Sequence, residues 1–270
     1  MIKRQTFNYH THTYRCGHAI GTEEEYIQAA IRSGFSTIGI SEHMGYYGWD
    51  DEKERIPYAQ LDDYINTVEK LKEKYKGIIN VRVGFECEYF DDSYEHLKEM
   101  KDKCDYLICG QHAPDRTNVY YDQAPYYEDK YIWKMAKQIC TGVEKGLFNY
   151  VAHPDYFMQS KCDFTEEKAK AIKEIAQCVK DYDGVIEINL KGTYYGRMDY
   201  SLTNSYRKEI GESYLYPNKA VYQIIGEVGT KVCFGYDAHT PKALLNRELE
   251  DSVRKEFEVF GLNMIEDLYL

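Results

Sequence analysis

Short apolar runs alternate with longer amphipathic segments along almost the whole chain. The apolar runs have the length and the aliphatic or aromatic content of buried strands. They centre on Tyr9, Ile38, Val83, Leu107, Val151, Ile186 and Cys233. Between them, apolar side chains recur at intervals of three and four residues, which predicts helices. These helices are expected over residues 23–34, 65–75, 93–103, 129–145, 165–180, 217–228 and 241–260.

Strand and helix therefore alternate about seven times. This alternation is typical of an α/β fold with a parallel sheet and right-handed crossovers. The first strand is not followed by a glycine-rich phosphate loop, which argues against a dinucleotide-binding fold. We expect the strands to close into a barrel that carries its chemistry at their C-terminal ends. No linker-like segment divides the 270 residues, so one domain over residues 1–270 is predicted.

The composition is acidic, with 34 Lys and Arg against 45 Asp and Glu and a net charge of −11. This charge disfavours nonspecific binding to nucleic acid or acidic membranes and favours a small-molecule substrate. No apolar run approaches the roughly 18 to 20 residues that span a bilayer, and the N-terminus has no signal-peptide core. We therefore expect a soluble, cytoplasmic protein, and the sequence leaves its oligomeric state open.

The eight cysteines include no C-x-x-C pair. Cys87, Cys109 and Cys233 lie inside predicted strands, so buried, reduced thiols are expected. Cys16 stands between His12 and His18. A metal or redox role for it competes with an inert loop thiol, and the inert thiol is favoured.

Seven of the eight histidines follow the ends of the apolar runs. They are His10, His12, His18, His43, His112, His153 and His239, and only His96 lies outside this pattern. Side chains two apart in an extended chain project to the same face, so His10 with His12 and Asp237 with His239 can each offer two donors to one place. Histidine is the commonest metal ligand. A multinuclear metal site is therefore predicted, against the alternative that some of these histidines are ordinary core or surface residues.

These motifs, in this order, resemble the PHP (polymerase and histidinol phosphatase) family. The resemblance spans almost the whole chain and rests on His10-Thr11-His12, Glu42-His43, Gly84-Phe85-Glu86, Gly110-Gln111-His112, His153-Pro154-Asp155 and Asp237-Ala238-His239. It implies an α/β fold of the distorted (β/α)7 barrel type, with a trinuclear metal site at the C-terminal ends of the strands. Asn8 and Tyr236 depart from the Asp and Ser that the family often has there, but neither belongs to the implied ligand set.

The resemblance also implies how nine ligands divide among three divalent metal ions. One ion would take His10, His12, Glu86 and Asp237. A second would share Glu86 as a bridge and add His112 and His153. The third would take His18, His43 and His239. This mixed imidazole and carboxylate ligation suits zinc, iron or manganese without selecting one of them.

Such a site suits hydrolysis of phosphate monoesters by a hydroxide that bridges metal ions. Asp237, His239, Glu42 and Asp155 are the candidate catalytic residues, and Glu42 and Asp155 would orient imidazoles or contact the substrate. Arg197 and Arg116 are candidates for binding the phosphate, because arginine suits bidentate phosphate contacts. For Glu42, Asp155, Arg197 and Arg116, a structural or solvated role remains the alternative.

The resemblance is to the histidinol-phosphatase branch, which implies hydrolysis of L-histidinol phosphate to L-histidinol and phosphate in histidine biosynthesis. Long insertions over residues 45–59, 113–128 and 191–216 could enclose such a substrate, and tyrosines in them either contact it or pack over the barrel mouth. The alternatives are a phosphatase for a nucleotide or sugar phosphate, a nucleic-acid-processing module, and a metal-bound scaffold without catalysis.

Overall fold

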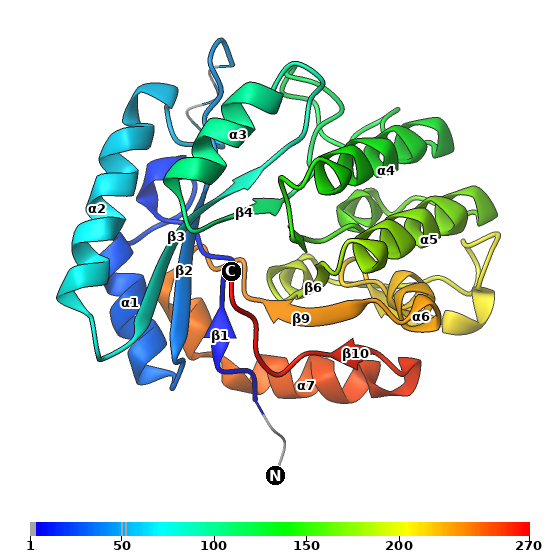
Figure 1. The fold of residues 1–270 in the computed structure, drawn as a ribbon. Coiled ribbons are helices and arrows are strands. Elements are labelled where there is room, and N and C mark those ends of the chain that lie inside the picture. Colours follow the sequence, from blue (N-terminus) through cyan, green and yellow to red (C-terminus); the bar gives the residue numbers. More distant parts are fainter. Residues whose placement is uncertain (1–3, 50, 52) are drawn as a thin grey trace.

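The fold is built around one curled sheet of eight parallel strands, with helices packed outside it (Figure 1). The computed structural model describes residues 4–49, 51 and 53–270. The sheet order is β1-β2-β3-β4-β5-β6-β9-β10. Its strands are β1 (Phe7–Asn8), β2 (Thr37–His43), β3 (Asn80–Cys87), β4 (Tyr106–Cys109), β5 (Tyr150–Val151), β6 (Val185–Asn189), β9 (Lys231–Gly235) and β10 (Asn263–Met264). The predicted α/β barrel architecture is thus confirmed, with one more strand than expected.

The helices follow the strands as the apolar periodicity predicts. They are α1 (Glu23–Arg32), α2 (Leu61–Lys74), α3 (Tyr94–Lys103), α4 (Asp129–Glu144), α5 (Glu166–Asp181), α6 (Lys219–Val228) and α7 (Arg247–Phe257). Capping fixes several of their starts. The Thr22 hydroxyl accepts from the Glu25 N–H while the Glu25 carboxylate accepts from the Thr22 N–H, which is a capping box. Thr165 caps α5 by accepting from the Lys168 N–H.

Side-chain amides join the two sides of the barrel between β1 and β9. The Gln5 amide N–H₂ donates to the carbonyls of Phe7 at 2.8 Å and Phe234 at 2.7 Å, and its oxygen accepts from the Phe234 N–H. One step along, the Asn8 oxygen accepts from the Tyr236 N–H at 2.9 Å. Beyond these contacts, Thr11 and Ala238 form an isolated parallel β-bridge. We call this junction the seam, and it holds the ends of β1 and β9 side by side.

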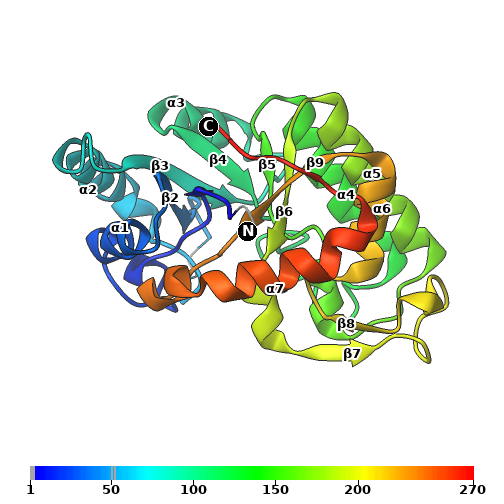
Figure 2. The ribbon, with the colours of Figure 1, turned by 90° about the horizontal axis from the view of Figure 1, so that it is seen from below.

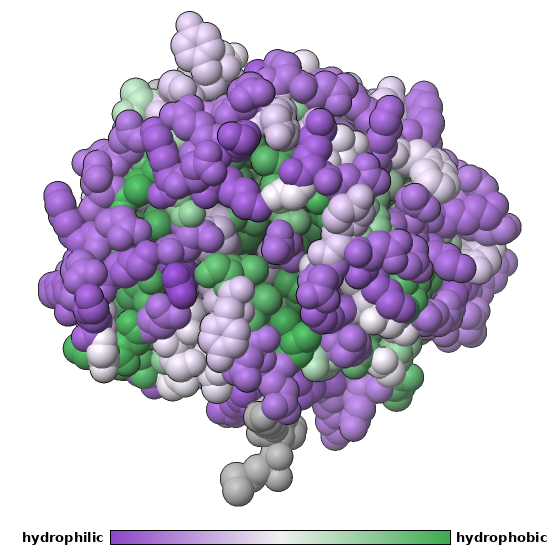
Figure 3. Space-filling view, viewed as in Figure 1, coloured by the Kyte–Doolittle hydropathy of each residue, from purple (hydrophilic) through white to green (hydrophobic). Residues whose placement is uncertain are grey.

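The interior of the barrel below the strand ends is apolar. Side chains from β1, β4, β5, β6 and β9 form a separate buried cluster there, and Ile265, Leu268 and Leu270 of the C-terminal segment pack against it. The Tyr9 hydroxyl donates to the carbonyl of Leu268 at 2.7 Å. Figure 3 shows the surface on the side seen in Figure 1, which is largely hydrophilic with apolar patches toward its middle. None of the helices in the described part of the chain has the length and apolar character needed to cross a bilayer.

Two stretches differ from their predictions. The helix expected over 241–260 is divided into a 3-10 helix (Pro241–Leu245) and α7, because the Asn246 side chain accepts from the Leu249 N–H and starts a new helix. The insertion over 191–216 contains an antiparallel pair, β7 (Arg197–Asp199) and β8 (Glu212–Tyr214), at the edge of the molecule. Figure 2 shows this pair and α7 from below. In the insertion over 45–59, Asp50 and Glu52 lie outside the described residues.

Candidate metal centre and substrate cavity

The nine candidate metal ligands converge at the C-terminal edge of the sheet. The carboxyl ends of parallel strands meet at one edge, which brings residues far apart in sequence together. His10 and His12 follow β1, His43 ends β2, and Glu86 lies in β3. The remaining ligand candidates follow a short 3-10 helix, η1 (Tyr14–Cys16), and the strands β4, β5 and β9, and they are His18, His112, His153, Asp237 and His239. His96 lies apart from them and contacts the Gly45 carbonyl at 3.1 Å.

Glu86 lies at the centre of this group, and its two oxygens contact five imidazoles. Glycine makes room for it, because a Cβ on Gly110 would lie 2.0 Å from Glu86 Oε1. Oε2 lies 3.0 Å from His43 Nδ1, 3.1 Å from His10 Nε2 and 3.3 Å from His12 Nε2, while Oε1 lies 2.8 Å from His153 Nε2 and 3.3 Å from His112 Nε2. A carboxylate so surrounded is suited to bridging two cations.

Five buried atoms of the candidate ligands have no hydrogen-bond partner. One is His12 Nδ1, and the other four are His10 Nε2, His12 Nε2, Glu86 Oε2 and Asp237 Oδ1. Asp237 Oδ1 lies 3.1 Å from His12 Nε2 and 3.7 Å from His10 Nε2, so the four atoms face one another. Buried polar atoms without partners are costly, and a divalent cation among them would satisfy all four. This donor set therefore fits a metal ion.

The charges of the two carboxylates agree with ligation. Burial by itself raises the pKa of Glu86, but the surrounding imidazoles, His10 first, outweigh burial and hold that pKa well below its usual value. Burial opposes ionisation of Asp237 in the same way, yet Lys191 and His10 keep its pKa well below the usual range. Both groups are thus in the deprotonated form that binds metal ions.

A second group of donors lies beside the first. His12, His43 and His239 each offer an atom within 4.8 Å of the others, as do Cys16, His18 and His239. His18 Nε2 and His239 Nε2 are 2.9 Å apart. Burial raises the pKa of Cys16 to about 12 and so keeps it as a thiol, which donates to a backbone carbonyl. Because the thiolate is the metal-binding form, this geometry favours the inert reading of Cys16.

Several polar side chains hold the ligands in place from behind. Glu187 Oε2 lies 2.7 Å from His10 Nδ1, and Asn189 donates to Asp237 Oδ2 at 3.1 Å. Glu42 accepts from the Thr13 hydroxyl at 2.7 Å, and its Oε1 lies 3.6 Å from His12 Nδ1. Such partners fix ring orientation and tautomer. Glu42 therefore supports the His12 segment and does not line the cavity.

Asp155, the other flanking acid, is also buried behind the site. Its Oδ2 accepts from the Asn218 N–H at 2.6 Å, just before α6, and it does not line the cavity. Burial raises the pKa of Asp155 to about 7. The side chain joins the loop after β5 to the start of α6, which is a structural role.

Replacing Asp155 with asparagine is expected to change the pH dependence of stability. The pKa of Asp155 is about 7 in the folded chain, against an ordinary value of 3.8. Between these two values the folded chain binds more protons than the unfolded chain. The free energy of unfolding therefore falls as the pH rises through this range. Asparagine can still accept from the Asn218 N–H but has no charge to bury. When the pH is raised from about 4.5 to about 8, metal-free D155N should gain roughly 3 kcal/mol in unfolding free energy relative to the parent. Urea denaturation at both pH values measures this, and a pH-independent difference would contradict it.

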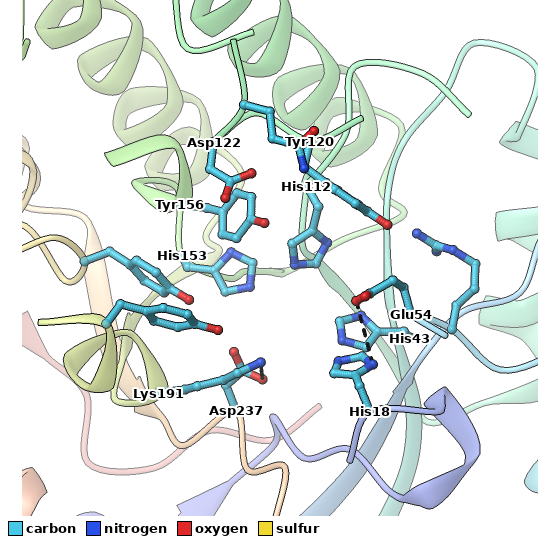
Figure 4. Close-up of a pocket in the computed structure, with 14 residues that line it drawn as sticks. His18, His43, Glu54, His112, Tyr120, Asp122, His153, Tyr156, Lys191 and Asp237 are labelled. Atoms are coloured by element: carbon cyan, nitrogen blue, oxygen red, sulfur yellow. Dashed lines mark ion pairs between the residues drawn. The ribbon is translucent and has the colours of Figure 1, made fainter. Parts of the chain in front are cut away.

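A cavity of about 250 Å³ opens directly over the ligands (Figure 4). That volume suits a small ligand. Its lining combines metal-ligand candidates with residues from four loops: His18, His43, Glu54, Arg55, His112, Tyr120, Asp122, Gln123, His153, Tyr156, Lys191, Tyr195, Tyr216 and Asp237. The insertions expected to enclose a substrate thus do contribute to its wall.

Two cations line this cavity. Lys191 Nζ lies 3.1 Å from His239 Nε2 and 3.8 Å from Asp237 Oδ1, at the edge of the metal-ligand cluster. Arg55 is almost completely buried and pairs with Glu88 at 3.2 and 3.3 Å. Glu88 also contacts His112 Nδ1 at 3.1 Å, so it links Arg55 to a candidate ligand.

The two arginines expected to bind phosphate lie elsewhere. Arg197, in β7, is paired with Glu212 at 2.6 Å and Glu256 at 2.5 Å. Arg116 pairs with Asp92 at 3.1 Å and stacks over two aromatic rings. Neither lines the cavity. The hairpin that carries Arg197 turns it toward α7, which the sequence did not indicate.

Sequence reasoning missed Lys191, Arg55 and Asp122 as cavity residues. Lys191 had a usable signal, because it stands two residues after Asn189 at the end of β6, where functional side chains gather. Arg55 and Asp122 lie in long insertions without a regular pattern. Their positions depend on how those loops fold back over the barrel.

The chain matches known proteins over most of its length. The family model described as PHP domain matches residues 8–191. A probable histidinol-phosphatase of Deinococcus radiodurans is 26% identical over 261 residues, covering 93% of each chain. One of Schizosaccharomyces pombe is 28% identical over 282 residues, covering 95% of this chain and 88% of the relative. The crystal structure of histidinol phosphate phosphatase from Lactococcus lactis, complexed with zinc, L-histidinol and phosphate, aligns with a TM-score of 0.69 at 16% identity, over 98% of this chain and 96% of that one.

Proposed function

Because the chain belongs to the PHP domain family, we propose that it is a metal-dependent phosphate monoester hydrolase that converts L-histidinol phosphate to L-histidinol and phosphate. The observation that carries the proposal is the set of four unpartnered buried donor atoms that face one another directly under a small cavity, whose lining includes the cations Lys191 and Arg55. The names of the relatives, which include two probable histidinol-phosphatases, support the choice of substrate. A cytoplasmic location stays a prediction.

We assign the nine candidate ligands to three divalent ions. His10, His12, Glu86 and Asp237 would hold one, and Glu86, His112 and His153 a second. His18, His43 and His239 would hold the third. Zinc is the first choice, since the Lactococcus lactis protein is described with zinc. When bound, such ions polarise phosphoryl oxygens and lower the pKa of a coordinated water.

The side chains of this protein would orient the substrate for hydrolysis. Lys191 lies where its ammonium can contact a phosphoryl oxygen held over Asp237 and His239. Lysine acts at such positions as a point charge. Arg55 is a second cation in the lining, and its buried pairing with Glu88 fixes its position. Tyr156 and Tyr216 close the side of the cavity and limit water access.

The direct test is phosphate release by the purified protein over a panel of small phosphate esters. We expect histidinol phosphate to be among the best substrates, ahead of sugar phosphates and nucleotides. Removal of metal by a chelator should abolish turnover, and zinc, iron or manganese should restore it. If a sugar phosphate or nucleotide is hydrolysed far better, the substrate assignment fails and only the hydrolase class stands. If single-stranded DNA is degraded instead, the nucleic-acid alternative replaces both.

A further inference from the structure

The cavity over the metal ligands has two walls of opposite charge. Lys191 lies beside Asp237 at one side. Figure 4 shows Asp122 on the far side, beyond His153 and next to Tyr156. A small ligand that spans the cavity would therefore meet a cation at one end and a carboxylate at the other.

The carboxylate of Asp122 is incompletely paired. Its Oδ2 accepts from Gln159 Nε2 at 3.1 Å, while its Oδ1 is buried without a hydrogen-bond partner. Among the described residues, no lysine or arginine forms an ion pair with it. Burial raises the pKa of Asp122 although the Tyr156 hydroxyl favours its charged form, which reflects the cost of the charge in this wall. An incoming cationic group would offset that cost.

We propose that Asp122 binds the ammonium group of the substrate and thereby selects phosphate esters that carry an amine. This inference rests on the proposed function, in which the phosphate lies over the metal ligands and Lys191. A zwitterionic amino-alcohol phosphate matches the two charged walls, whereas a sugar phosphate offers no cation to Asp122. Tyr156, which contributes its ring to the same wall, would shield the ion pair from water and strengthen it.

Glu54 is the competing carboxylate in the lining. Its side chain is 49% exposed, and it lies 3.8 Å from His18 Nδ1. Solvent screens a charge so exposed, and the nearby His18 already faces it. Asp122 is the more buried acid and has the free oxygen, so it is the stronger site for an ammonium ion.

The test compares two substrates on the metal-loaded enzyme. One is histidinol phosphate, and the other is the same ester without its amine, 3-(imidazol-4-yl)propyl phosphate. Asp122→Asn should lower kcat/KM for histidinol phosphate by about 10- to 100-fold, mainly through KM, since hydrogen bonds to charged groups contribute about that much. For the deaminated ester, kcat/KM should change less than about threefold in the same variant, because this ester has no ammonium group to pair with the carboxylate. L-Histidinol binding, measured by calorimetry, should weaken by a similar factor.

Asp115→Asn is the matched control, because Asp115 is an acid in the same loop that does not line the cavity. This variant should have the parent kcat/KM for both substrates. An equal loss for both esters in Asp122→Asn would overturn the inference and make Asp122 a structural residue. A selective loss in Glu54→Gln instead would also overturn it. Hydrolysis of neither ester by the parent enzyme would refute the proposed function itself, which is a distinguishable result.

Discussion

Replacing Glu86 with glutamine should lower kcat/KM by roughly 10⁴-fold and remove about two of the bound metal ions per chain. The carboxylate contacts five imidazoles through its two oxygens. The amide has one oxygen in place of two and no charge, so it cannot bridge cations. Losses of several kcal/mol are typical when metal-held charge stabilisation is removed. Metal analysis of the dialysed protein, together with phosphate release, measures both effects.

Glu88 provides the control for this prediction, because it is a buried carboxylate two residues away, directly after the end of β3. It contacts His112 and Arg55 rather than the centre of the cluster. Glu88→Gln should therefore lower kcat/KM by only about 10- to 100-fold, which is the range expected for a group that orients a metal ligand. Glu86→Asp keeps the charge but shortens the side chain, and it should also lose metal. Full metal content in Glu86→Gln would show that Glu86 is not a ligand.

Replacing Lys191 with methionine should lower kcat/KM by roughly 10²- to 10³-fold while the metal content stays unchanged. Its ammonium lies at the boundary between the ligands and the cavity, where the charge of a phosphate would be stabilised. The loss of one well-placed donor to such a charge has about this effect. Lys191→Arg should restore part of the activity, since it returns the charge with a different geometry.

Arg197→Met is the matched comparison, and it should change kcat/KM by less than about threefold. Its guanidinium is paired with Glu212 and Glu256, away from the cavity, and exposed pairs contribute little. If Arg197→Met were the more damaged variant, the β7–β8 hairpin would have to move to the cavity during catalysis. The assignment of Lys191 would then be wrong.

The elements that could be predicted from the sequence are those with a strong repeating pattern. All seven apolar runs contain or adjoin a strand, and α1 to α6 lie where the three- and four-residue spacing predicts them. The missed strands are two or three residues long and have no alternation to detect. The interruption at Asn246 depends on one capping side chain within a segment that otherwise reads as a continuous helix.

The residues of the candidate site also fall into a group that the sequence predicts and a group that it does not. Ligands at strand ends could be predicted, because strand direction and parallel pairing determine where they meet. Substrate contacts could not, because they come from insertions whose path depends on tertiary packing. Arg55 reaches the cavity because it pairs with Glu88 and stacks on Trp49 at 3.6 Å. Nothing in the local sequence around Arg55 predicts those contacts.

The seam has a consequence for the folding of the protein. His10 and His12 lie on one side of it and Asp237 and His239 on the other, near opposite ends of the chain. Bringing such segments together has the entropic cost of closing a very long loop. A metal ion shared between His10 and Asp237 would act as a reversible cross-link at that closure, and its binding free energy would add to that of the folded state. Metal supply would then govern the lifetime of the protein as well as its activity.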